Sequence, residues 1–146
     1  MNIRFENKET FYISGYSVET SEATLEKDCA MLRQKYESKL RSVSDHLYFL
    51  SWATKEGAMT YLLGVEATGQ TPATEGAICK RVPAKRFAAT IVPDGASILA
   101  TWYEFFAFFE KEIPSMGGGA IDLEFPFYFE SFDENGVCEL WIPVKE

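Results

Sequence analysis

Residues 48–67 read YFLSWATKEGAMTYLLGVEA, and residues 128–146 read YFESFDENGVCELWIPVKE. Each stretch has two runs of aromatic and branched side chains around a polar turn that contains glycine, which is the pattern of a β-hairpin. YFLSWATKEG, at the start of the first stretch, resembles YFESFDENG, at the start of the second. YLLGVEA at 61–67 likewise aligns with LWIPVKE at 140–146. The chain is therefore predicted to contain one supersecondary unit twice.

The segments before the two hairpins also follow a common order. Strands are predicted over residues 2–20 and 78–92, because apolar and aromatic side chains are dense there and turn residues bound them. In residues 25–43 the apolar side chains recur at spacings of three and four, which predicts one apolar face of a helix. A second helix, apolar nearly all round, is predicted over residues 98–113, with Ser97 as its N-cap. The order strand, helix, strand, strand thus occurs twice.

This order predicts an α+β fold built as a tandem β-α-β-β repeat with pseudo-twofold symmetry. One domain, residues 1–146, is expected, with repeats at 1–68 and 78–146 and a loop-like linker, GQTPATEGA, at 69–77. Both helices are expected to cover one face of an antiparallel sheet. A cleft where the repeats meet is the natural place for a ligand.

Composition narrows the function classes. A formal net charge of −8 and a pI near 4.7 disfavour direct nucleic-acid binding, which depends on Lys and Arg. The three scattered cysteines and one histidine predict neither a disulfide framework nor a metal site, and no cofactor is expected. The N-terminus has no signal-peptide pattern and no apolar run has bilayer length, so a cytoplasmic protein without membrane association is predicted. Aromatic residues make up 15%, enough to line a ligand pocket as well as a core.

Strand alternation predicts which side chains face the cleft. Leu123, Phe125, Phe127 and Phe129 share one parity and are expected to pack under the helices. The other parity is expected to form an open face with a glutamate inside an aromatic box, a favourable arrangement for a cation. The predicted members of this box are Glu130, Tyr48, Trp52, Tyr128, Phe132 and Trp141. From the second helix, Trp102 or Tyr103 is expected to form one wall.

An ordered set of motifs resembles the GyrI-like, or AraC-type effector-binding, domain. The motifs are YISGYSV at 12–18, YLLGVEA at 61–67, KRVPAKRFAATI at 80–91, the helix with Trp102 that ends at Ile113-Pro114, FYFESF at 127–132 and ELWIPV at 139–144. The resemblance implies a central hydrophobic pocket in which Glu130 and the following aromatic Phe132 meet cationic or aromatic ligands. Many family members also have a Trp in the first helix, and residues 25–36 of this chain contain none.

The resemblance implies three alternative activities. The first is a stand-alone module of bacterial multidrug type, which senses or sequesters bulky aromatic or cationic compounds. The second is a hydrolase that opens the cyclopropane ring of DNA-alkylating xenobiotics and so confers resistance, with Glu130 activating water. The third is a gyrase inhibitor, or another module whose partner is a protein such as gyrase or a separate regulator. Because the chain begins on its first predicted strand, a self-contained DNA-binding regulator is not expected.

Overall fold

The computed structural model describes residues 1–54, 56–111 and 121–146. In these ranges the chain forms eight strands and two helices. Their bounds are β1 Arg4–Lys8, β2 Phe11–Thr20, α1 Leu25–Arg41, β3 Leu47–Ala53, β4 Met59–Ala67, β5 Ile78–Val82, β6 Lys85–Ile91, α2 Ile98–Lys111, β7 Tyr128–Phe132 and β8 Cys138–Pro143. Neither helix is long and apolar enough, over the described residues, to cross a membrane.

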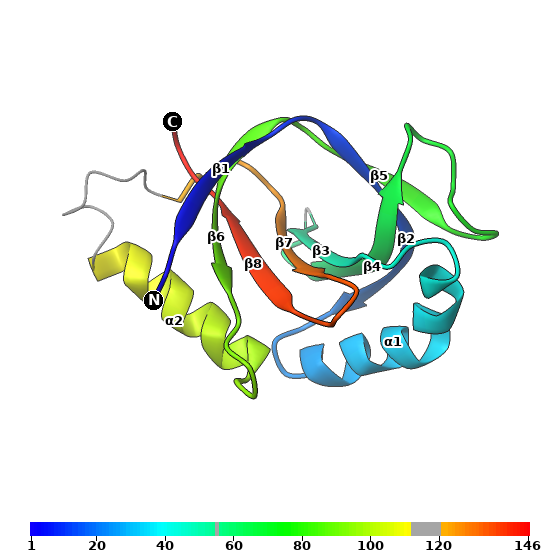
Figure 1. Ribbon diagram of the computed structural model, residues 1–146, viewed down its shortest axis with the longest axis horizontal. Helices are drawn as coiled ribbons and strands as arrows, with labels where there is room; N and C mark the ends of the chain where they lie inside the picture. Colours follow the sequence, from blue (N-terminus) through cyan, green and yellow to red (C-terminus); the bar gives the residue numbers. More distant parts are fainter. Residues whose placement is uncertain (55, 112–120) are drawn as a thin grey trace.

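All eight strands belong to one antiparallel sheet in the order β1-β6-β8-β7-β3-β4-β2-β5 (Figure 1). The order is symmetric about the β7–β3 pair at its centre. The first strand of each repeat is exchanged, since β1 pairs with β6 and β5 pairs with β2. Each half of the sheet therefore contains a strand from the other half of the sequence.

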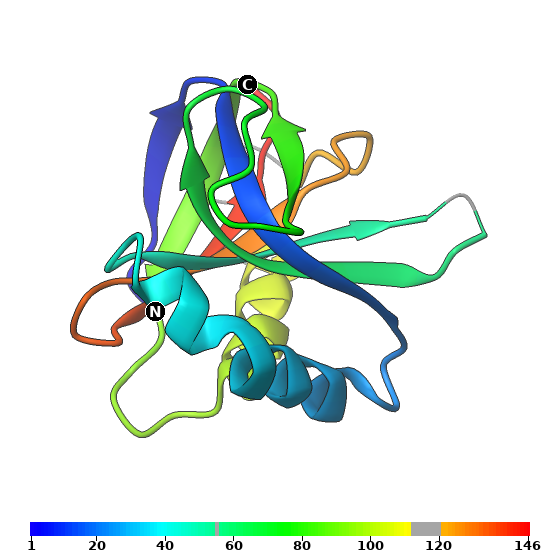
Figure 2. The ribbon, with the colours of Figure 1, turned by 90° about the vertical axis from the view of Figure 1, so that its right-hand side faces the viewer.

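Both helices lie along the same face of the sheet (Figure 1), and the turned view shows the β3–β4 hairpin projecting beyond the sheet (Figure 2). We call this the helix face; its buried side chains pack in one cluster with those of α1 and α2, and they include Phe49, Leu63 and Ile142. A second cluster, with Leu50, Leu62 and Phe129, occupies the opposite face. The predicted α+β class, with an antiparallel sheet and both helices on one face, is confirmed.

The element boundaries follow local sequence signals closely. Ser97 caps α2 as predicted, since its Oγ accepts a hydrogen bond from the backbone N–H of Ala100 at 3.2 Å. Leu123 and Phe125, which were expected to share a strand with Phe129, lie before it, because β7 begins only at Tyr128. Upstream of it Phe125 N–H bonds to the Asp122 carbonyl and closes a turn. The predicted end of the second helix, at residues 113–114, lies outside the described residues.

Candidate ligand-binding site

The two helices pack on the sheet mainly through their later turns. Leu32 and Leu40 of α1 and Phe105 and Phe109 of α2 are all buried. The first turns of both helices instead border a cavity of about 410 Å³, which adjoins a second hollow of about 330 Å³. The two share four lining residues, Leu25, Tyr61, Leu99 and Trp102. They therefore form one continuous cleft, with the helix face of the sheet as its floor.

Glu130 lies in this cleft, in the middle of β7. Only 9% of it is exposed, and it pairs with Phe49 on β3 and with Leu140 on β8. Its Oε2 accepts a hydrogen bond of 2.7 Å from the indole Nε1 of Trp102. No Lys or Arg of the described residues forms an ion pair with it. A carboxylate has about four acceptor positions, so most of the hydrogen-bonding capacity of Glu130 is left for a ligand.

The electrostatics of the cleft are dominated by this buried carboxyl. Burial raises the pKa of Glu130 above its ordinary value, while the Trp102 hydrogen bond and the positive charge of Arg33 act in the opposite direction. Burial also raises the pKa of the Cys29 thiol to about 12, and the Glu130 charge adds to that rise. The pKa of Tyr61 is raised by the same two causes in the same order. Both groups are therefore neutral, and Glu130 is the acidic group of the cavity floor.

One cationic side chain, Arg33 of α1, also lines this cavity. Its Nη1 bonds to Oε1 of Glu37, one turn later, at 2.7 Å. Its guanidinium lies 4.4 Å from the ring centroid of Phe132 and 5.4 Å from that of Phe49. The ion pair with Glu37 and the two aromatic rings therefore fix the position of Arg33. Arg33 forms no ion pair with Glu130.

The second hollow is the aromatic end of the cleft. Tyr128 and Phe106 face each other there at a ring-centroid distance of 5.9 Å, and Trp102 stacks on Phe106 at 5.7 Å. Tyr103, which is 55% exposed, lies at the rim and donates a hydrogen bond of 2.8 Å to Glu22. The structure therefore brings Trp102, Tyr128 and Glu130 into one cleft, with Tyr103 at its rim. Phe132, also predicted for the site, is buried on the same face beneath Arg33.

The predicted face of β7 is wrong, and with it the aromatic box. Tyr128, Glu130 and Phe132, expected on the open face, lie on the helix face. Tyr48, Trp52 and Trp141 belong to the cluster on the opposite face and therefore do not surround Glu130. In the register, Leu50 lies opposite Leu62 and Phe129 lies opposite Trp141. The alignment of residues 61–67 with 140–146 makes Leu62 equivalent to Trp141, so their strand partners, Leu50 and Phe129, are equivalent too. The alignment of YFLSW with YFESF had instead matched Leu50 with Glu130, which is one residue out of register. A slip of one residue moves every side chain of a strand to the other face.

The same slip reverses the assignment of the predicted core residues. Phe125, Phe127 and Phe129 pack on the opposite face and not under the helices. Leu123 is 82% exposed because it lies in the turn that precedes β7. Phe129 instead stacks on Trp141 at a centroid distance of 5.2 Å.

Basic side chains cover the aromatic rings of the opposite face. The Nζ of Lys80 lies 4.6 Å from the ring centroid of Trp52, and that of Lys8 lies 4.5 Å from Trp141. Trp141 Nε1 donates to Ser131 Oγ at 2.9 Å, and Tyr48 donates to Glu66 at 2.7 Å. These polar groups already have partners, and resident cations occupy the ring faces that a cationic ligand would need.

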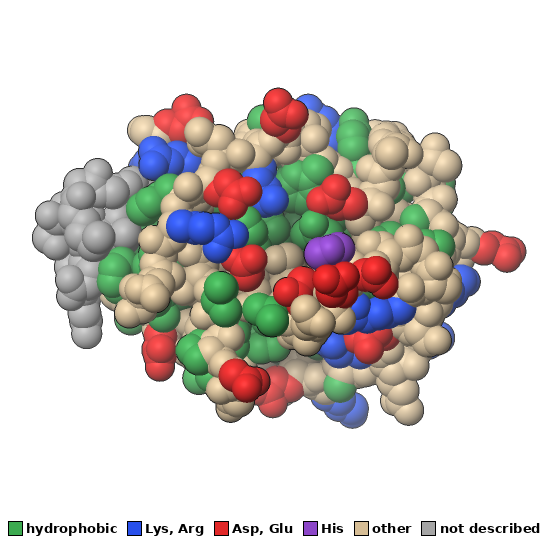
Figure 3. Space-filling model, viewed as in Figure 1, with side chains coloured by type: hydrophobic (Ala, Val, Ile, Leu, Met, Phe, Trp, Pro, Cys, Tyr) green, Lys and Arg blue, Asp and Glu red, His purple; other side chains and the backbone are tan. Residues whose placement is uncertain are grey.

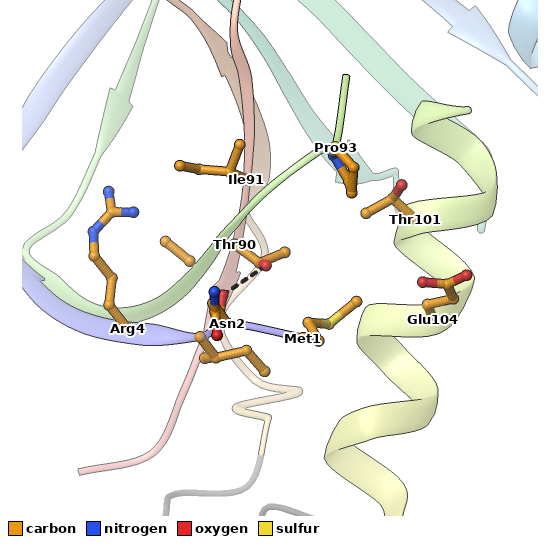
Figure 4. A pocket seen from close by; sticks show the side chains of 10 residues that line it. Met1, Asn2, Arg4, Thr90, Ile91, Pro93, Thr101 and Glu104 are labelled. Carbon is orange, nitrogen blue, oxygen red and sulfur yellow. Dashed lines mark hydrogen bonds between the residues drawn. The ribbon is translucent and has the colours of Figure 1, made fainter. Parts of the chain in front are cut away.

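A larger hollow lies elsewhere, between the start of β1, the end of β6 and α2 (Figure 4), and has a volume of about 710 Å³. Its two buried polar side chains are satisfied within the protein. Thr90 donates to the Asn2 carbonyl at 2.8 Å, as the dashed line shows, and Thr101 donates to the Ser97 carbonyl at 2.8 Å. Despite its size, this hollow offers no buried charge to a ligand among its described lining residues, so the cleft with Glu130 is the better candidate.

The charged side chains on the surface form no single patch in the view of Figure 3. Acidic and basic side chains are interspersed over the face in Figure 3, where the single histidine, His46, lies beside acidic side chains. Across residues 1–54, 56–111 and 121–146, no three His, Cys, Asp or Glu side chains gather as metal ligands would. The cleft therefore remains the feature with a definite chemical character.

Several residues of the cleft were not predicted as site residues. Leu25, Cys29 and Arg33 come from α1, and Phe49 and Tyr61 come from the helix face of the sheet. Tyr61 shares its strand parity with Leu63 and Val65, so assigning Glu130 to that face would have placed Tyr61 beside it. For Arg33 the sequence carries no signal, because a basic residue on a helix is ordinarily solvated.

The sequence matches no family model and no curated protein. Solved structures do share its architecture. The structure of SAV2435 bound to tetraphenylphosphonium superimposes with a TM-score of 0.72 at 14% identity, over 99% of this chain and 94% of that one. An integron cassette protein from the mobile metagenome of Vibrio cholerae superimposes with a TM-score of 0.72 at 14% identity, over 98% of this chain and 95% of that one. The C-terminal domain of EcmrR superimposes with a TM-score of 0.60 at 12% identity, over 99% of this chain and 98% of that one. At these identities the likeness shows a common fold.

Proposed function

We propose that this chain binds a bulky, lipophilic cation in the cleft between α1 and α2, with Glu130 as the counter-charge. The observation that carries the proposal is a nine-tenths buried carboxylate on the floor of an aromatic cavity, without an ion-pair partner in the described part of the chain. A buried charge is costly unless it is paired, so this arrangement favours a cation supplied from outside. Trp102, Tyr61 and Tyr128 supply ring faces for such a ligand.

Two further facts support this proposal. A protein of the same fold, SAV2435, has been solved with tetraphenylphosphonium bound. The motifs that resemble the GyrI-like effector-binding domain also run through the elements that form the cleft. We infer that the chain is an effector-binding module of that kind, which senses or sequesters compounds of this class.

The test is a calorimetric titration of the wild-type chain with tetraphenylphosphonium and with tetraphenylborate, an anion of nearly the same shape. The cation is expected to bind about ten-fold more tightly or better, because the anion would be placed next to a like charge in a desolvated cavity. Equal binding of the two ions, or preference for the borate, would exclude Glu130 as the group that selects the ligand.

Affinity for the cation is expected to depend on pH. Only the ionised carboxylate attracts it, and the pKa of Glu130 is raised from the ordinary value of 4.5. As pH is lowered from 8, affinity should therefore begin to fall at a pH above 4.5 and should continue to fall as Glu130 takes up its proton. Tetraphenylphosphonium itself does not titrate, so the measured midpoint reports on the protein. A flat affinity between pH 8 and 5 would contradict the assignment.

The raised pKa of Glu130 also supports a second function, hydrolysis of a strained electrophile. A carboxylate of raised pKa is a better general base, and Glu130 would take a proton from a water molecule that attacks a cyclopropane carbon held between Trp102 and Tyr61. As the C–O bond forms, a ring C–C bond breaks and its electron pair passes to a carbonyl group conjugated with the ring. The proton then returns from Glu130 to that product, so that one water is added overall. Mass spectrometry of cyclopropane-bearing alkylators incubated with the protein decides between the functions. A product heavier by one water, formed by the wild type and not by Glu130→Gln, identifies a hydrolase, whereas unchanged compound identifies a binding protein.

A further inference from the structure

The side chains along the floor of the cleft are ordered by charge and polarity. Tyr128, Glu130 and Phe132 alternate along β7 and all point to the helix face. Same-face neighbours on a strand are about 7 Å apart. The floor thus runs from an aromatic end at Tyr128, through the carboxylate of Glu130, to the ring of Phe132.

Arg33 is located at the Phe132 end of this row. Its guanidinium lies over Phe132, two residues after Glu130, and over Phe49, which is opposite Glu130 in the register. A guanidinium has five N–H donors, and one of its nitrogens, Nη1, bonds to Glu37. The remaining donors are available to a molecule in the cavity, which Arg33 lines.

We propose that the cavity selects dipolar ligands, which place a positive centre at Glu130 and an anionic group at Arg33. The inference rests on the proposed function and names a narrower class of ligand for the same site. Arg33 is then a specificity-determining residue with two effects. It offers charge-assisted hydrogen bonds to a carboxylate, and it repels a ligand that is only cationic.

The side chain of Arg33 is 34% exposed, so its effect is moderated by water. Its position is nevertheless well defined, because two aromatic rings support the guanidinium and Glu37 fixes one of its edges. A planar group held in this way loses little freedom when it binds a carboxylate. The expected discrimination is therefore a few-fold rather than several orders of magnitude.

Two dyes that differ by one methyl group test this inference. Rhodamine 110 carries a cationic ring system and a free carboxylate, whereas rhodamine 123 is its methyl ester and carries only the positive charge. Fluorescence anisotropy of both dyes with the wild type is expected to show about three-fold or tighter binding of rhodamine 110. Arg33→Met keeps an apolar stem over the two rings and removes the charge. In this variant rhodamine 110 should weaken, rhodamine 123 should gain affinity, and the preference should disappear or reverse.

The matched control is Lys35→Met, which removes an equal charge from an exposed position of α1 outside the cavity. It should leave the ratio of the two affinities unchanged, and thermal melting should show both variants folded. A ratio unaffected by Arg33→Met overturns the inference, as does failure of the dyes to bind a protein that binds tetraphenylphosphonium. If neither tetraphenylphosphonium nor either dye binds the wild type, the proposed function of binding a lipophilic cation is wrong, and so is this inference.

Discussion

Glu130→Gln is expected to weaken tetraphenylphosphonium binding by about 30-fold or more. Removing one partner of a buried charge pair costs roughly 2 kcal/mol or more, and about 1.4 kcal/mol corresponds to ten-fold in affinity. The amide keeps the shape of the side chain, so the cavity and its aromatic walls remain and only the charge is lost. Isothermal titration calorimetry of the two proteins, at a pH well above the pKa of Glu130, measures the effect.

The control for this substitution is Glu66→Gln. Glu66 lies on β4, is exposed, and accepts a hydrogen bond from Tyr48 on the face away from the helices. Its replacement changes the net charge of the protein by the same amount and should leave the affinity within about two-fold. An equal loss from both substitutions would mean that the cation responds to overall charge and not to the cleft.

Glu130→Gln should also raise the melting temperature at neutral pH. A carboxyl whose pKa is raised in the folded protein holds its proton more tightly when folded than when unfolded. Folding stability therefore falls as pH rises from the ordinary value of 4.5 through the raised pKa. The amide does not ionise and escapes this loss. If Glu130→Gln binds tetraphenylphosphonium more weakly but melts at a higher temperature, Glu130 serves ligand binding at the expense of stability. If both the affinity and the melting temperature fall, Glu130 has a structural role.

Gly15→Ala is expected to destabilise the protein by about 3 kcal/mol or more. Gly15 on β2 is opposite Gly64 on β4, and a Cβ at Gly15 would lie 1.9 Å from the carbonyl oxygen of Leu63 and 2.5 Å from the Cα of Gly64. Both neighbours are backbone atoms and cannot move aside as a side-chain tip could. For a domain of this size the change corresponds to a fall in melting temperature of about 10 °C. Circular dichroism during heating measures it.

The comparison for this prediction is Gly69→Ala. Gly69 has φ of +68°, which an alanine tolerates poorly, but a Cβ there would meet nothing within 4 Å. Gly69→Ala should therefore lower the free energy of unfolding by only about 1 kcal/mol, through backbone strain. If Gly15→Ala costs no more than Gly69→Ala, the close approach of β2 and β4 is not needed by the fold.

Local signals in the sequence were sufficient to predict most of the elements. β3 and β4, Leu47–Ala53 and Met59–Ala67, form the hairpin predicted within residues 48–67, because a turn with glycine separates two dense apolar runs. Gly15, within YISGYSV, lies where the backbones of β2 and β4 approach closely, which is a common reason for a glycine inside a strand. By contrast, the exchange of β1 and β5 between the halves was not predicted, because strand pairing is a long-range property that no local pattern encodes.

The candidate site was predicted only in part. Glu130, Tyr128 and Trp102 do meet in one cleft, but this cleft lies on the helix face and not on the open face where the glutamate was expected. Tyr48, Trp52 and Trp141, which were predicted to surround it, lie on the opposite face. The similar sequences YFLSW and YFESF matched Glu130 with Leu50. The hydrogen-bonded register of the strands instead makes Ser51 the equivalent of Glu130. Because both faces of the central strands are apolar and aromatic, hydrophobic alternation did not reveal the slip.

A crystal structure of the wild-type protein with tetraphenylphosphonium tests whether the ligand site is the cleft between α1 and α2, with Glu130 as its charged group. We expect the phosphonium in contact with Trp102 and Tyr61, with its positive centre nearest the Glu130 carboxylate. A cation bound on the opposite face, against Trp52 or Trp141, or in the large hollow beside β1, would contradict it.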